Sequence, residues 1–156
     1  MANKPRVLIV EARFYEDIAD ALVKGAIAAL ENAGCDYERI SVPGVFEVPA
    51  AVSMAYASTV DDSGLAKYDG VISLGCVIRG ETDHYDHICR EVSRGLMDLS
   101  IDLMMPHGFG ILTCENRDQA WARADTAQRN IGGRAAEACL RMIEIRATHA
   151  FADFAN

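Results

Sequence analysis

The feature that most constrains this chain is a strand that runs through a glycine turn directly into a helix, within residues 70–86. Residues 71–78 form a near-continuous apolar run rich in β-branched side chains, which is typical of a strand covered on both faces of a parallel sheet. From Asp83 onward the apolar side chains recur at helical spacing instead. The stretch therefore predicts a buried strand, a turn at residues 79–82 and a helix.

The turn and the helix start that follows it have the properties of an anion site. A helix start presents unpaired backbone N–H groups and the positive end of a dipole, which favour a phosphate or a carboxylate. His84 then lies in the first helical turn beside that anion, where an imidazole can transfer protons. The alternative is that Gly80 serves only the turn and that Thr82 or Asp83 caps the helix. In that case His84 is an ordinary solvated residue, and the stretch alone leaves both interpretations open.

Length and composition indicate one α/β domain over residues 1–156. Hydrophobic residues make up 51% of the chain and aromatic residues only 7%, so we expect a mostly aliphatic core. The formal net charge of −8 argues against nucleic acid or an anionic membrane as a partner. Any anionic substrate must therefore be held by a local positive site.

The sequence also predicts where the protein resides. No apolar run approaches the length of a membrane span, and the N-terminus lacks the pattern of a signal peptide, so we expect a cytoplasmic protein. The five cysteines are widely spaced among apolar neighbours. This spacing predicts small core residues in a reducing compartment rather than disulfides or a metal site.

Strands and helices are expected to alternate along the chain. Apolar runs predict strands at residues 6–12, 37–42, 70–78 and 107–114. Helical periodicity predicts helices at about residues 16–32, 49–57, 83–99, 115–125 and 133–148, with a break at residues 130–133. Right-handed crossovers then give a parallel sheet inside a three-layer α/β/α sandwich.

Candidate binding residues gather at the carboxyl ends of the strands, where an open α/β sheet binds ligands. Phe14 is either a stacking platform for a ligand or a hydrophobic staple for the next helix. In the rigid loop at residues 43–49, Glu47 either accepts hydrogen bonds from hydroxyl groups or has no specific role. Arg123 is either a phosphate-binding fork or a surface arginine. Phe109, a further candidate at this edge, stands between two glycines that permit close approach to a ligand or to a neighbouring strand.

Four segments together carry a family resemblance: ARF at 12–14, PGVFEVP at 43–49, LGCVIRGETDHYD at 74–86 and FGILTCEN at 109–116. They resemble the lumazine synthase family, the penultimate enzymes of riboflavin biosynthesis, in the same order and over nearly the whole chain. The resemblance implies a flavodoxin-like three-layer α/β/α sandwich with a four-stranded parallel sheet. It also implies a transferase that condenses 5-amino-6-(D-ribitylamino)uracil with 3,4-dihydroxy-2-butanone 4-phosphate to 6,7-dimethyl-8-ribityllumazine, phosphate and water. This reaction needs no cofactor and no metal.

The resemblance implies a role for each matching position. His84 transfers protons, Phe14 stacks on the pyrimidinedione ring, and Glu47 accepts hydrogen bonds from the ribityl hydroxyls. The residues implied to bind the organic substrates are Phe14, Val45, Phe46, Glu47, Cys76, Val77, Ile78 and Phe109. Those implied to bind phosphate are Glu81 and Thr82, through their N–H groups, and Arg123. Phe109 is expected from a neighbouring subunit of a homopentamer with active sites at its subunit interfaces.

Several positions depart from the family pattern. Tyr15 stands where asparagine is common, and Glu81 places a carboxylate beside the expected phosphate, so its side chain must point away. Ala127 and Ile131 stand where lysine is common. Residues 125–133 lack the Gly-Thr/Gly-Lys-Ala-Gly signature of icosahedral shells, so we expect a free homopentamer.

Two other functions stay open. One is a non-catalytic lumazine- or flavin-binding protein of the same fold, which needs neither the proton transfer of His84 nor the phosphate capture of Arg123. The other is a small flavodoxin-like electron carrier, which needs a tightly bound flavin.

Overall fold

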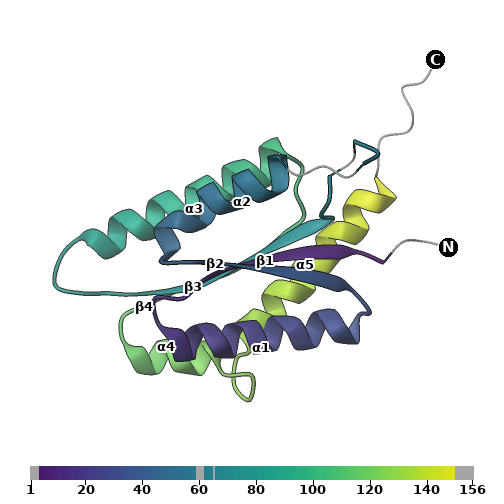
Figure 1. The fold of residues 1–156 in the computed structure, drawn as a ribbon. Coiled ribbons are helices and arrows are strands. Elements are labelled where there is room, and N and C mark those ends of the chain that lie inside the picture. The colour runs from purple at the N-terminus through teal and green to yellow at the C-terminus, as the bar shows by residue number, and fades with distance from the viewer. Residues whose placement is uncertain (1–3, 59–61, 65, 150–156) are drawn as a thin grey trace.

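Strands and helices alternate along the computed structural model, which describes residues 4–58, 62–64 and 66–149 (Figure 1). The strands are β1 (Arg6–Ala12), β2 (Asp36–Val42), β3 (Gly70–Ile78) and β4 (His107–Cys114). The longer helices are α1 (Glu16–Asn32), α3 (His84–Asp102), α4 (Arg117–Ala124) and α5 (Ile131–Thr148). The short helix α2 (Val48–Val52) follows a 3-10 turn at Val45–Glu47 and runs into a π-helical turn at Ser53–Ala57.

The four strands form one parallel sheet in the order β2-β1-β3-β4. Residues 7–12 of β1 and residues 70–76 of β3 are all buried, because helices cover both faces of these two inner strands. The edge strand β2 is only partly buried along its length. The near-continuous apolar runs in the sequence thus mark the two inner strands.

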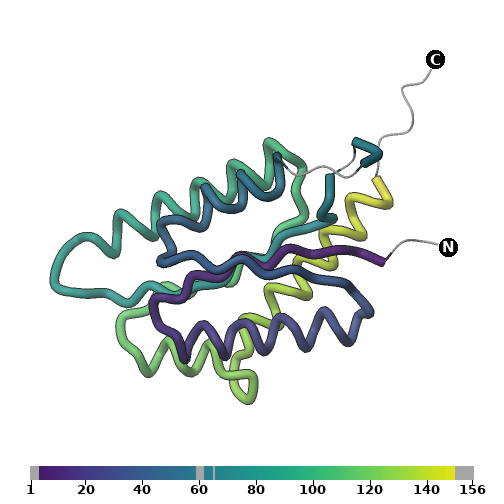
Figure 2. The backbone as a smooth tube through the Cα atoms, viewed as in Figure 1, coloured from purple at the N-terminus to yellow at the C-terminus, as the bar shows by residue number. Residues whose placement is uncertain are grey.

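Two helical layers enclose the sheet, with α2 and α3 on one face and α1, α4 and α5 on the other (Figures 1 and 2). Leu8, Val10 and Val71 point into the first layer, and Val7, Ile9 and Ile72 point into the second. Both clusters are dominated by aliphatic side chains, as the composition predicts. The expected flavodoxin-like three-layer sandwich with a four-stranded parallel sheet is confirmed.

Most expected boundaries agree with the structure to within a few residues. The expected break between the last two helices lies at residues 125–130 rather than 130–133, because α5 already begins at Ile131. Asn130 caps this helix, with its side-chain oxygen 3.2 Å from the backbone N of Gly133. A Cβ on Gly132 would lie 1.9 Å from the carbonyl oxygen of Leu22 in α1, so glycine is needed where the two helices cross and not for a break.

The glycine before Phe109 also has a packing role. A Cβ on Gly108 would lie 2.0 Å from the carbonyl oxygen of Ala135 in α5. The close approach that this glycine permits is therefore to a helix. The second flanking glycine, Gly110, does lie close to a neighbouring strand, because its Cβ would come 3.2 Å from the backbone oxygen of Ser73 in β3. The polar residues 60–67, which include Gly64, also predict a surface loop before β3, and of these, residues 60, 61 and 65 lie outside the described residues.

All five cysteines are free thiols, and four of them are buried. This confirms their predicted use as small core residues, with Cys89 only partly buried. None of the helices in the described part of the chain combines the length and apolar character that a membrane crossing requires.

Candidate active site

A cavity of about 700 Å³ opens at the carboxyl ends of β1 and β3. The chain leaves β1 for β2 on one side, while β3 lies on the other side, so the cavity sits at the switch point of the sheet. Its walls come from the β1–α1 turn, the loop before α2, the end of β3 and the start of α3. The lining residues are Phe14, Tyr15, Gly44, Val45, Phe46, Glu47, Cys76, Val77, Ile78, His84, His87 and Ile88.

Most of the predicted site residues meet in this cavity. Eight of them line it: Phe14, Val45, Phe46, Glu47, Cys76, Val77, Ile78 and His84. They come from three of the four sequence segments quoted above, which are far apart along the chain. The fold therefore brings these segments to one place.

Phe14 faces the cavity with 72% of its surface exposed. Its ring and that of Tyr15 meet edge to face at a centroid distance of 4.9 Å, and Tyr15 packs against the core. A hydrophobic staple would bury Phe14 against α1, so its exposure rules out that interpretation. The ring is left available as a flat apolar platform.

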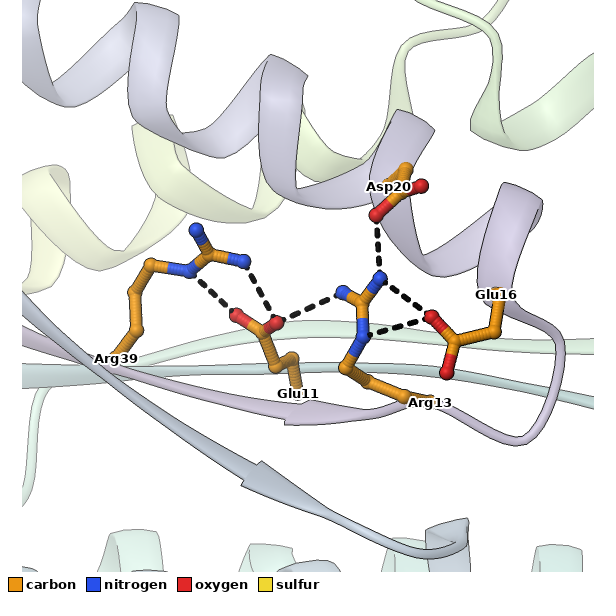
Figure 3. A network of polar contacts seen from close by, with 5 residues as sticks. All are labelled: Glu11, Arg13, Glu16, Asp20 and Arg39. Carbon is orange, nitrogen blue, oxygen red and sulfur yellow. Dashed lines mark hydrogen bonds and ion pairs between the residues drawn. The ribbon is translucent and has the colours of Figure 1, made fainter.

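A network of charges fixes the turn that carries Phe14 (Figure 3). The carboxylate of Glu11, only 2% exposed, accepts hydrogen bonds of 2.8 and 2.7 Å from Arg39 on β2 and one of 2.8 Å from Arg13. Arg13 also donates to Glu16 and Asp20 on α1. These acidic partners, Asp20 above all, raise the pKa of the Arg13 guanidinium. The network ties the end of β1 to β2 and to the start of α1.

The loop before α2 places two side chains at the cavity. Val45 and Val48 are buried in the core and anchor the loop. Phe46, between them, is 65% exposed, and Glu47 is exposed as well. The Phe46 ring and the Glu47 carboxylate therefore line the cavity on a loop that the buried Val45 and Val48 hold in place.

The end of β3 forms an apolar wall of the cavity. Cys76 is buried, and burial raises the pKa of its thiol to about 12, so it stays protonated at neutral pH. Val77 and Ile78 are half-buried and continue this wall. Such a surface suits the faces and edges of an aromatic heterocycle.

The start of α3 carries the two histidines of the cavity, His84 and His87. The backbone N–H of His84 donates to the Thr82 hydroxyl at 3.3 Å. Asp83 occupies the capping position, but its side chain makes no capping hydrogen bond and lies 3.2 Å from His87 Nε2 instead. Asp83 therefore occupies the predicted capping position, but its carboxylate does not cap the helix.

Arg79 fastens the turn that precedes α3. Its guanidinium lies 4.3 Å from the centre of the Tyr85 ring. It donates to Asp86 on α3 at 3.1 and 3.2 Å and to Glu115 beyond β4 at 2.9 Å. Residues 80–83 are therefore held between the helix and the neighbouring strand end.

Four predicted residues do not line the cavity: Glu81, Thr82, Phe109 and Arg123. Glu81 and Thr82 are exposed in the turn just before α3. Phe109 was expected at the carboxyl edge, and this is wrong for a single chain, because it pairs with Ser73 toward the amino end of β4. Its ring is 44% exposed on that edge strand.

Arg123 lies in the last turn of α4 and is partly buried. Its Nη1 donates to the carbonyl oxygen of Gln119 at 3.1 Å. Burial raises the pKa of the nearby Cys114 thiol, and the positive charge of Arg123 partly offsets this rise. The guanidinium therefore sits near the carboxyl end of β4, outside the cavity of its own chain.

Four lining residues were not predicted: Tyr15, Gly44, His87 and Ile88. The spacing of His87, one helical turn after His84, is the sequence signal that points to it. Within residues 4–58, 62–64 and 66–149, no three His, Cys, Asp or Glu side chains are grouped closely enough to hold a metal ion.

The family comparison agrees with this geometry. The model of the 6,7-dimethyl-8-ribityllumazine synthase family matches residues 4–147. The chain belongs to this family. Among its relatives, the 6,7-dimethyl-8-ribityllumazine synthase of Agrobacterium fabrum is 53% identical over 144 residues, which cover 92% of this chain and 96% of the relative.

Two further relatives bear the same name. The lumazine synthase of Bartonella tribocorum is 50% identical over 94% of this chain and 93% of its own length. That of Paramagnetospirillum magneticum is 48% identical over 90% of this chain and 94% of its own length. The similarity to lumazine synthases therefore covers most of this chain and not only the four short segments.

Proposed function

We propose that the chain is a transferase of riboflavin biosynthesis that carries out the reaction for which its relatives are named. It condenses 5-amino-6-(D-ribitylamino)uracil with 3,4-dihydroxy-2-butanone 4-phosphate and yields 6,7-dimethyl-8-ribityllumazine, phosphate and water. The observation that carries this proposal is the cavity at the switch point, where three family-matching segments meet beside His84. The cytoplasm, where small anionic metabolites are available, is its proposed location.

The cavity walls suit the two substrates. The Phe14 ring stacks on the pyrimidinedione, and the apolar wall of residues 76–78 meets the ring edge and the ribityl chain. Val45 and Phe46 line the ribityl pocket, and the Glu47 carboxylate accepts hydrogen bonds from the ribityl hydroxyls. Holding both substrates in one slot supplies much of the rate through positioning.

The start of α3 performs the polar part of the reaction. The backbone N–H groups of Glu81 and Thr82, in the turn just before the helix, bind the phosphate of the butanone substrate. The Glu81 carboxylate is exposed and leaves the backbone free for this contact. After the exocyclic amine attacks the ketone, a Schiff base forms, phosphate leaves and the ring closes. His84 moves protons during these steps.

Phe109 and Arg123 require a second copy of the chain. Neither residue lines the cavity of its own chain, and Phe109 is exposed on the edge strand β4. We therefore place both on a neighbouring subunit, where Phe109 closes the aromatic sandwich and Arg123 binds phosphate. A free homopentamer with sites at its subunit interfaces provides this arrangement.

Mixing two impaired variants tests the shared site. The His84→Ala and Arg123→Ala variants are each impaired alone, because each lacks one half of the site. When the two are unfolded and refolded together, some interfaces regain both wild-type residues, and activity returns. Activity no higher than the sum of the separate variants would contradict a shared site. Light scattering should give the mass of a pentamer, and a much larger shell would contradict the free form.

The carrier alternative is not favoured, because the relatives are named as synthases. The His84→Ala variant distinguishes the two functions. Loss of proton transfer should lower kcat by about 100- to 10,000-fold while residual activity remains from positioning. His149→Gln, which changes an exposed histidine at the far end of α5, is the matched control and should leave kcat unchanged. Equal turnover of His84→Ala and wild type would remove the assigned role.

A further inference from the structure

A second imidazole borders the cavity beside His84. His87 follows three residues later on α3, and both side chains line the same cavity. Residues with this spacing lie on one face of a helix, so the two rings are neighbours across one turn. The side chain of His87 is 65% exposed, which leaves it accessible from the cavity. None of the roles assigned above uses this residue.

Asp83 determines which nitrogen of His87 carries a proton. The Asp83 Oδ2 lies 3.2 Å from His87 Nε2. An ionised carboxylate only accepts hydrogen bonds, so this contact places the proton on Nε2 and leaves the lone pair of the neutral ring on Nδ1. A base oriented by a third group in this way is a recurring arrangement in enzymes that transfer protons.

We propose that His87 is a second proton-transfer group of the site, oriented by Asp83 and working beside His84. The inference rests on the proposed synthase function. When the substrate amine forms its C–N bond to the ketone carbon, the carbonyl oxygen takes a proton from His84 and His87 Nδ1 accepts a proton from the nitrogen. When the C–O bond of the resulting carbinolamine breaks, His87 returns its proton to the departing hydroxyl, which leaves as water. The second proton of the nitrogen goes to His84 as the C=N bond forms, so both imidazoles end the step as they began.

Charged and titratable groups surround His87. They are Asp83, Asp86 and Glu91 on α3 and, around the cavity, Tyr15, Glu47, Cys76 and His84. Arg79 pairs with Asp86 and Arg94 pairs with Glu91, whereas the Asp83 carboxylate contacts the His87 ring. The reaction releases protons and takes them up again at several atoms, so two imidazoles allow one to donate while the other accepts.

The test compares His87→Asn with wild type in steady-state assays over a range of pH. Asparagine keeps a polar side chain but cannot transfer a proton near neutral pH, so kcat should fall roughly 100-fold while both KM values stay unchanged. Asp83→Asn removes the carboxylate that orients the His87 ring, so kcat should fall by less than in His87→Asn while both KM values stay unchanged. His149→Gln should match wild type throughout.

Chemical rescue separates proton transfer from a structural role. In the His87→Gly variant, added imidazole can enter the vacated space and should restore part of kcat in a concentration-dependent manner. Wild-type kcat and pH profile in His87→Asn would overturn the inference, and so would a rise in KM alone or a loss that imidazole does not rescue. The wild-type protein is measured in the same assay. If it is active, these outcomes contradict only the role of His87 and not the synthase function. If the wild type is inactive, the synthase function itself is contradicted.

Discussion

Gly132 at the start of α5 lies directly against the backbone of Leu22 in α1, where an added Cβ would come within 1.9 Å of the Leu22 carbonyl oxygen. The contact holds together the two longest helices of one layer. Since backbone atoms cannot move aside without shifting a helix, Gly132→Ala should lower the free energy of unfolding by roughly 1–3 kcal/mol. Urea unfolding measures this loss. Glu137→Ala, on the exposed side of α5, is the control and should change stability by less than about 0.5 kcal/mol.

The buried carboxylate of Glu11 links β1 to both Arg39 and Arg13 (Figure 3). Glu11→Ala removes the shared acceptor and leaves two guanidinium groups facing a vacated space. We expect a loss of about 2 kcal/mol in unfolding free energy, because hydrogen bonds to charged groups are among the stronger ones. The same change should raise KM for the pyrimidine substrate, since the turn carrying Phe14 loses its anchor.

A matched exposed pair provides the control for Glu11. Glu91 and Arg94 form a similar contact on the surface of α3, with side chains 53% and 61% exposed. Exposed pairs contribute little, so Glu91→Ala should cost under about 1 kcal/mol. Equal losses in the Glu11 and Glu91 variants would show that burial of the first carboxylate has no special effect.

His107 makes the stability of the fold depend on pH. Its Nε2 lies 2.7 Å from the Ser73 hydroxyl oxygen, and burial lowers its pKa from 6.5 to about 4. Between these values the unfolded chain binds more protons than the folded one. The stability is therefore complete above pH 6.5 and is lost as the pH falls toward 4, by up to roughly 3 kcal/mol.

The His107→Gln variant isolates this effect from the carboxylates, which also titrate at low pH. Glutamine has no charge to gain, so the variant should lose less stability than wild type between pH 6.5 and pH 4. Denaturant unfolding at a series of pH values gives the slope of unfolding free energy against pH for the wild type and for the variant. Identical slopes would contradict a buried neutral imidazole.

The sequence predicts the sheet well because buried strands have a clear pattern. The apolar runs at residues 6–12 and 70–78 mark strands with both faces covered, and both agree with the structure. Glu11 was overlooked, although a carboxylate inside such a run indicates a buried charge pair. The boundary of α5 could not be predicted from local pattern, since the glycines there serve a contact with α1 that only the tertiary structure reveals.

The candidate site was predictable where its residues adjoin strand ends. Phe14 and residues 76–78 follow from the rule that parallel strands present their carboxyl ends at one edge. Phe109 could not be placed in this way, because its register with Ser73 sets it toward the opposite edge. The place of His87 could be predicted only once it was known which face of α3 meets the cavity.

The most direct test of the central claim is anaerobic incubation of the purified protein with the two substrates, while lumazine absorbance and phosphate release are followed together. The proposed function predicts that both products appear in equal amounts, faster than in the spontaneous condensation. Rates no faster than that background, together with retained binding of lumazine or riboflavin, would contradict the synthase and establish a carrier of the same fold.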